Sequence, residues 1–179
     1  YADRIYQINL AIAGIAVGTV SLPVLSKAFK TRNLNKISDI QNKSFELSLL
    51  FSIPASFGLI LASEEIVNAL FGYGSFTKND VEMTAAALKF FGYGVPAFAL
   101  IKILSNFFFA RNNTKTPFYI STLIVILNIF ISVSLFNRIG FIIIPIATSI
   151  STWVGVLIYL YSLNSRNYLL LSPFHFYFY

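Results

Sequence analysis

Cysteine is absent from this 179-residue chain, and charged residues are scarce. Without cysteine the chain has no disulfides and no thiolate metal sites, and its redox compartment is left undetermined. Charged residues make up 11% of the chain, against about a quarter in a soluble domain, whereas hydrophobic residues make up 56% and the mean hydropathy is +0.72. These values exclude an ordinary soluble domain and indicate an all-α integral membrane protein.

Residues that could carry catalysis are also few. The only histidine is His175, in an aromatic tail, and a lone histidine there is far more often incidental than catalytic. We find no Cys/His cluster, no Ser/His/Asp constellation and no pair of central carboxylates with a shared task. What the chain offers instead is proline-kinked helices, small residues at packing positions and a few ionisable groups near the membrane ends, which are the parts of a transporter. The sequence therefore predicts a transporter rather than an enzyme, with no cofactor and no metal, and does not indicate a coupling ion or a dependence on membrane potential.

The chain begins at Tyr1 without an initiator Met or a basic region before an apolar core, and we expect it to be a fragment of a longer polypeptide. A helix needs about 20 apolar residues to cross the hydrocarbon core. Five stretches meet this criterion, at about residues 5–25, 45–62, 85–110, 118–136 and 141–163. The tail, residues 164–179, is too short to cross and is either the stump of a further helix or an interfacial segment.

The basic residues are distributed unevenly among the connections. Five lie in a predicted polar connection from Ser26 to Ser44, two lie between Arg111 and Pro117, and Arg166 follows the last span. The opposite side holds only Lys78 and Arg138. Because lysine and arginine favour the cytoplasmic side, the first span is predicted to run from outside to inside. The formal net charge of +6 then needs no nucleic-acid partner.

Several local patterns predict helix ends and helix contacts. Gly14 and Gly18 would let another helix approach closely. Thr77 and Asp80 have the spacing of a capping box, which predicts that a helix starts near Lys78. Asn128 is predicted to hydrogen-bond between helices. Four hydroxyl residues are predicted to bond back to their own helix, namely Thr148, Ser149, Ser151 and Thr152.

The strongest candidate site stands at the start of the first span. Asp3 and Arg4 lead directly into an almost unbroken apolar run, and charged residues at such a position face protein or water. One interpretation is that both line a polar cavity between helices. The alternative is that Asp3 caps the helix and Arg4 is an anchor among lipid headgroups.

Gln7, Lys102 and Glu46 are secondary polar candidates. Lys102 lies within the third apolar run, so its partner must come from another helix or from solvent. Alternatively, its long side chain reaches toward the headgroups, because Arg111 is only nine positions further along. Both interpretations remain open from the sequence.

Six stretches together resemble one family in order and spacing. They are Tyr1-Ala-Asp-Arg-Ile-Tyr-Gln7, Gly14-Ile-Ala-Val-Gly-Thr-Val20, Leu22-Pro-x-Leu-Ser-Lys27, Leu70-Phe-Gly-Tyr-Gly-x-Phe76, Pro96-Ala-Phe-x-Leu-Ile-Lys102 and Ala110-Arg-Asn-Asn-Thr-Lys-Thr-Pro117. They resemble the MurJ (MviN) family of lipid II flippases, in the multidrug/oligosaccharidyl-lipid/polysaccharide exporter superfamily. The resemblance implies a bundle of fourteen membrane spans in the bacterial inner membrane, of which this chain would be about the eighth to twelfth.

The resemblance also implies roles for residues. Asp3 and Arg4 would face the central cavity, with the arginine on the pyrophosphate of the lipid-linked muropeptide. The partners would be lipid II, membrane lipids and the remaining half of the transporter, which supplies further cavity arginines. The chain departs from the family pattern at Asn9, Ala11 and Asn113, where proline, glycine and aspartate are usual.

The function predicted from this resemblance is translocation of undecaprenyl-pyrophosphate-linked peptidoglycan precursor across the inner membrane. One alternative is a multidrug or polysaccharide exporter of the same superfamily. Another is a truncated remnant without activity, which the abrupt aromatic tail would fit. Cavity arginines in the upstream sequence would favour the flippase, and intramembrane acids would favour a drug exporter.

Overall fold

The computed structural model describes residues 1–10, 17–31, 33–74 and 76–168, and every long element in these ranges is a helix. The all-α prediction is confirmed. The helices are α1 (Ala2–Leu10), α2 (Val17–Lys30), α3 (Leu34–Leu61), α4 (Ser63–Phe71), α5 (Lys78–Phe109), α6 (Lys115–Ile139) and α7 (Ile143–Ser165), with a short 3-10 turn at Gly140–Ile142.

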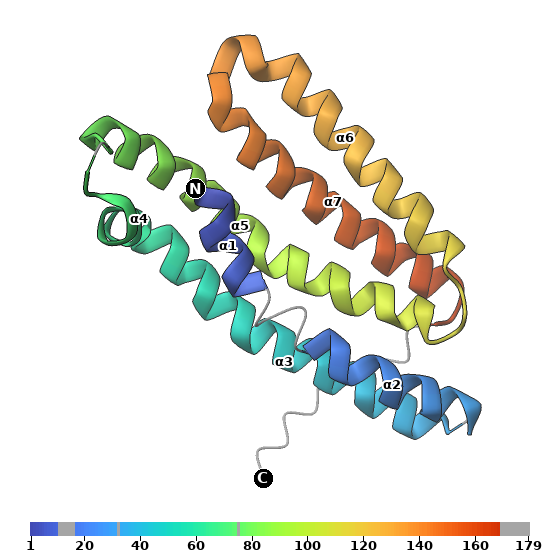
Figure 1. The fold of residues 1–179 in the computed structure, drawn as a ribbon. Helices are drawn as coiled ribbons and strands as arrows, with labels where there is room; N and C mark the ends of the chain where they lie inside the picture. The colour runs from blue at the N-terminus through green and yellow to red at the C-terminus, as the bar shows by residue number, and fades with distance from the viewer. Residues whose placement is uncertain (11–16, 32, 75, 169–179) are drawn as a thin grey trace.

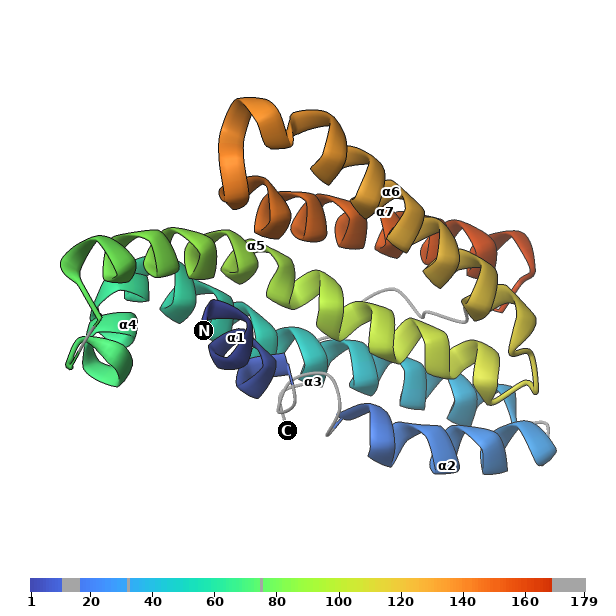
Figure 2. The same cartoon turned by 45° about the horizontal axis from the view of Figure 1, so that its top comes forward.

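Helix α5 is the centre of the bundle. It lies between α3 on one side and α7 on the other, while α6 packs on α7 and lies further out (Figure 1). Helices α1 and α2 lie on the side of the bundle away from the α6–α7 hairpin, α1 against α5 and α2 against both α3 and α5 (Figure 2). Consistent with this position, α5 carries several fully buried side chains, among them Leu88, Ile103 and Phe107.

Three stretches of the described chain are long and apolar enough to cross a membrane, namely Leu34–Leu61, Lys78–Phe109 and Lys115–Ser165, the last comprising α6 and α7. They overlap four of the five predicted spans. The first predicted span, residues 5–25, falls on α1, α2 and the intervening residues 11–16, which lie outside the described part together with Gly14. The exact membrane boundaries stay a prediction.

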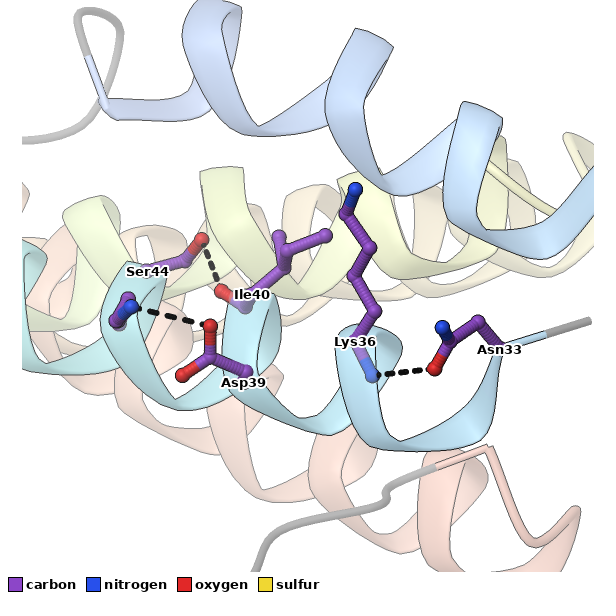
Figure 3. A network of polar contacts seen from close by, with 6 residues as sticks. Asn33, Lys36, Asp39, Ile40 and Ser44 are labelled. Atoms are coloured by element: carbon purple, nitrogen blue, oxygen red, sulfur yellow. Dashed lines mark hydrogen bonds and ion pairs between the residues drawn. The ribbon is translucent and has the colours of Figure 1, made fainter. Parts of the chain in front are cut away.

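The predicted polar connection from Ser26 to Ser44 is largely helical, and that prediction was wrong. Helix α2 continues to Lys30 and α3 already begins at Leu34. The side chain of Asn33 caps α3 by accepting a hydrogen bond from the amide of Lys36 at 3.0 Å (Figure 3). One turn later Lys43 pairs with Asp39 at 3.1 Å, four residues apart. The polar composition of this segment predicts a loop, but oppositely charged residues four positions apart stabilise a helix.

The predicted capping box is confirmed at the start of α5. The side chain of Thr77 accepts a hydrogen bond from the Asp80 amide at 3.3 Å, and Asp80 Oδ2 accepts one from the Thr77 amide at 2.9 Å. An aspartate therefore replaces the usual glutamate without loss of either bond. Helix α4 was not predicted, although Glu64 and Glu65 suit the first turn of a helix.

A proline in α5 is accommodated by side chains from two neighbouring helices. Pro96 has no N–H to donate to the carbonyl of Gly92, four residues earlier. Ser56 of α3 donates its Oγ hydrogen to this carbonyl at 2.7 Å. Trp153 of α7 donates from Nε1 to the next carbonyl, that of Tyr93, at 2.9 Å. Partners on α3 and α7 thus satisfy backbone groups around the proline, as a membrane helix requires.

Polar side chains also join α7 to its neighbours. Asn128 of α6 donates to Thr148 Oγ1 at 2.9 Å, which confirms the predicted interhelical bond. The hydroxyls of Thr148, Ser151 and Thr152 bond back to carbonyls of α7 itself, as predicted. Ser149 differs, because its Oγ donates to the carbonyl of Phe90 on α5 at 2.7 Å. Three of the four predicted back-bonds are therefore present.

Replacing Asn128 with alanine should loosen the α6–α7 hairpin. Hydrogen bonds between membrane helices contribute about 0.6 kcal/mol on average and up to about 1.7 kcal/mol, so we expect a loss of roughly 1 kcal/mol in the free energy of unfolding. Unfolding of the full-length parent protein in mixed micelles measures this loss. Asn137→Ala is the matched control, because Asn137 is exposed at the end of the same helix. Equal losses in both variants would contradict the assignment.

Candidate functional site on the first helix

Helix α1 has one buried face and one exposed polar face. Ala2, Ile5 and Tyr6 are 8%, 7% and 6% exposed and pack into the bundle. Asp3, Arg4 and Gln7 lie on the exposed face. Because a helix turns about 100° per residue, positions 3, 4 and 7 fall on one side. The described part of the chain therefore presents these three polar side chains outward from a helix that is packed on its other side.

Aromatic contacts hold α1 against α5. The ring of Tyr6 stacks on Phe91, with 5.0 Å between centroids and 7° between planes, and lies 5.2 Å from Phe98. Just before the helix, Tyr1 makes edge contacts with Phe71 at the end of α4 and with Phe76 in the connection to α5. Aromatic pairs of this kind add to the burial energy and restrict orientation. These contacts therefore fix the orientation of the polar face of α1 relative to α5.

Within the polar face the carboxylate already has a partner. Gln7 Nε2 donates to Asp3 Oδ2 at 2.6 Å, across one helical turn. The single ion pair within 4.0 Å in the described residues is Lys43 with Asp39, so Arg4 is not paired with Asp3. The guanidinium is thus exposed and unpaired with any carboxylate of the described residues. It can bind an anion that approaches this face.

Lys102 lies on the side of α5 that α1 and α2 flank. Phe98, one turn earlier, contacts Tyr6 of α1. Asn106, one turn later, donates from Nδ2 to the carbonyl of Gly18 in α2 at 2.7 Å. Lys102 is exposed between them, about 6 Å along the axis from each. The structure therefore places Lys102 and Arg4 on the same side of the bundle, without a direct contact between them.

Glu46 lies elsewhere. It is exposed on α3, about 200° around the helix from the buried Ser44 and Ser48, which face the bundle. No hydrogen bond or ion pair among the described residues joins Glu46 to Arg4.

Asn106 was not predicted as a contact residue, although a polar side chain in an apolar run is a signal for one. The assignment of all these residues to substrate binding stays a prediction.

Comparison with known proteins identifies the family. The model of the family described as lipid II flippase MurJ matches residues 1–176. The chain belongs to the MurJ family of lipid II flippases. The resemblance inferred from the sequence motifs is thereby confirmed.

Two curated relatives and one solved structure illustrate the similarity. A probable lipid II flippase MurJ of Rickettsia prowazekii (strain Madrid E) is 40% identical over 163 residues, which are 90% of this chain and 32% of the relative. The MurJ of Rhizobium meliloti (strain 1021), also described as probable, is 39% identical over 88% of this chain and 30% of the relative. A structure of lipid II flippase MurJ in the inward closed conformation is similar with a TM-score of 0.84 and 30% identity, over 94% of this chain and 36% of the other.

The chain spans about a third of the length of the MurJ relatives that it matches. The helices described above are thus one part of a multi-pass membrane transporter fold.

Proposed function

We propose that the full-length parent protein translocates lipid II, the undecaprenyl-pyrophosphate-linked disaccharide-pentapeptide, from the inner to the outer leaflet of the bacterial inner membrane. This chain would supply one wall of the transport cavity, and the remaining part of the transporter would supply the other. The observation that carries the proposal is the exposed, carboxylate-free Arg4 on the firmly packed α1 of a MurJ family member. Transport would proceed without covalent chemistry or a bound cofactor.

The chemistry of arginine suits this substrate. A planar guanidinium can donate two parallel hydrogen bonds to phosphate oxygens, which the point charge of lysine cannot do. The carboxylate of Asp3 accepts a hydrogen bond from the side-chain amide of Gln7 and is not paired with Arg4. The guanidinium of Arg4 would therefore be available for the pyrophosphate. Lys102 lies on the side of α5 that α1 and α2 flank, and it would add positive potential along the path of the anionic headgroup.

The proposed orientation follows from the distribution of basic residues. We use the term basic end for the end of the bundle where α2, α5 and α7 finish and α3 and α6 begin (Figure 1). It carries Lys27, Lys30, Lys36, Lys43, Arg111, Lys115 and Arg166. The positive-inside rule places this end in the cytoplasm, so α1 would run from outside to inside.

Complementation tests the proposed function. The full-length parent is expressed in cells depleted of their own lipid II flippase, and growth is measured together with the exposure of lipid II to an enzyme added outside the inner membrane. We expect growth and exposure to be restored together. If neither is restored at a membrane expression level equal to that of a known MurJ, the flippase proposal fails, and an exporter of another substrate or an inactive protein takes its place.

A further inference from the structure

An arginine at the basic end lies between two aromatic rings from distant parts of the chain. Arg111 lies two residues after the end of α5, in the turn toward α6. Its guanidinium carbon is 4.3 Å from the ring centroid of Phe29 in α2 and 4.0 Å from that of Tyr168, which follows α7. Both distances are within the range of a cation–π interaction. One side chain thus connects the ends of three helices.

The carbonyl of Tyr168 receives two hydrogen bonds at the same place. Arg111 donates to it from Nη2 at 3.0 Å, and Gln41 of α3 donates from Nε2 at 3.1 Å. Gln41 is completely buried, although glutamine is a residue usually found at the surface. The ring of Tyr168 makes a further edge contact with Phe108 at 5.9 Å. Tyr168, which follows α7, therefore contacts α3 and α5 directly and is linked to α2 through Arg111.

The path of the backbone at Tyr168 also departs from the helix. Asn167 has a φ of +53°, in the left-handed region, and the amide of Tyr168 donates to the carbonyl of Leu163 at 2.8 Å. This arrangement ends α7 and turns the chain toward α3 and α5. The direction in which the polypeptide leaves α7 is thus set by contacts around one residue.

Only arginine can make all of these contacts together. Its flat guanidinium stacks on two rings while an N–H at its edge donates to a carbonyl, and lysine lacks both the planar surface and the fork. Burial lowers the pKa of Arg111, but an arginine stays protonated in proteins. In contrast, Arg166 at the same end of the bundle is exposed.

We propose that Arg111 is a positioning residue that clamps Tyr168 onto the ends of α2, α3 and α5 and so fixes where the polypeptide leaves α7. The basic ends of these four helices would then keep their spacing while the transporter changes conformation. This role does not depend on which substrate the transporter carries. It assigns to Arg111 a function beyond its contribution to the positive charge of the basic end.

Distance measurements between spin labels test the clamp in the full-length parent, with any native cysteines replaced. One label pair is placed at Asn35 and Asn164, both exposed at the basic end, and a second pair at Asn79 and Asn137, both exposed at the opposite end. We expect Arg111→Ala to broaden the distance distribution of the first pair and to leave that of the second unchanged.

Comparison variants separate positioning from charge and from general stability. Arg166→Ala removes the same charge at the same end and should leave both distributions unchanged. Arg111→Lys keeps the charge but not the stacking or the fork, and should broaden the first pair. Phe29→Leu, which removes one ring of the sandwich, and Gln41→Leu, which removes one donor, should broaden it less; they carry the test if Arg111→Ala does not fold.

Three results would overturn the proposal. The first is a distribution for Arg111→Ala as narrow as that of the unchanged protein. The second is full retention of the narrow distribution by Arg111→Lys, which would show that charge alone is sufficient. The third is equal broadening of both label pairs, which would make Arg111 a residue of general stability rather than of local position.

Discussion

Arg4→Ala in the full-length parent is expected to abolish rescue of cells depleted of their own lipid II flippase. Hydrogen bonds to charged groups contribute about 1.5–3 kcal/mol each, so a lost bidentate contact with pyrophosphate removes roughly 3 kcal/mol or more. That is at least about a hundredfold in affinity. Growth at matched membrane expression measures rescue, and binding of lipid II to the purified protein measures the affinity directly.

Two further variants make this prediction specific. Arg4→Lys keeps the positive charge but loses the paired donors, and we expect it to fail as well. Arg138→Ala is the control, because Arg138 is an exposed arginine at the end of the bundle opposite the basic end and should be dispensable. Rescue by Arg4→Ala equal to the unchanged protein would make Arg4 a headgroup anchor. Full rescue by Arg4→Lys would refute the bidentate contact while leaving a role for the charge.

Features that depend on neighbours in the sequence were predictable from it. The capping box of Thr77 and Asp80 is one, since its two hydrogen bonds are made within a single turn. The back-bonds of Thr148 and Thr152 are another. The same local reasoning failed for Ser26–Ser44, because the prediction gave more weight to the polarity of the charged residues than to their helical spacing. Polarity predicts exposure to water, but it does not by itself predict the absence of a helix.

Features that depend on distant segments were not predictable from one sequence. Nothing in the spacing of Ser56 and Gly92 indicates that this hydroxyl would satisfy a carbonyl left free by Pro96. Arg111 counted only as one more positive charge, because its two ring partners are 82 and 57 positions away. Such contacts follow from how the helices pack.

The candidate site lies between these two cases. Its polar residues are predictable from the sequence because a charged residue next to an apolar run is unfavourable unless it faces protein or water. The hydrogen bond from Gln7 to Asp3 was not foreseen, although residues four apart on a helix face each other. In our proposal the opposite wall of the cavity would belong to the part of the transporter outside this chain, which is why no contact within this chain marks Arg4 as a substrate-binding residue.

Gly92→Leu is expected to separate α3 from α5 and to destabilise the transporter severely. A Cβ atom at Gly92 would lie 2.9 Å from Ile60 Cγ1, 3.3 Å from Leu59 Cβ and 3.4 Å from the Ser56 carbonyl oxygen. The larger side chain must push the two helices apart and would break the hydrogen bond from Ser56 to the Gly92 carbonyl. Overpacking costs about 1–3 kcal/mol and occasionally more, so with the lost hydrogen bond we expect about 3 kcal/mol or more.

Thermal unfolding of the purified full-length parent measures this loss, and Gly→Ala changes provide a matched pair. Gly92→Ala should lower the melting temperature, because even a methyl group meets Ile60 at this crossing. Gly58→Ala should leave it unchanged or raise it, since a Cβ at Gly58 meets nothing within 4 Å and alanine favours a helix by about 1 kcal/mol over glycine. If the Gly92→Leu variant has the same melting temperature as the unchanged protein, α3 and α5 do not cross at Gly92. The Gly92 carbonyl would then need a donor other than Ser56, because a carbonyl that Pro96 leaves free must be satisfied in the membrane.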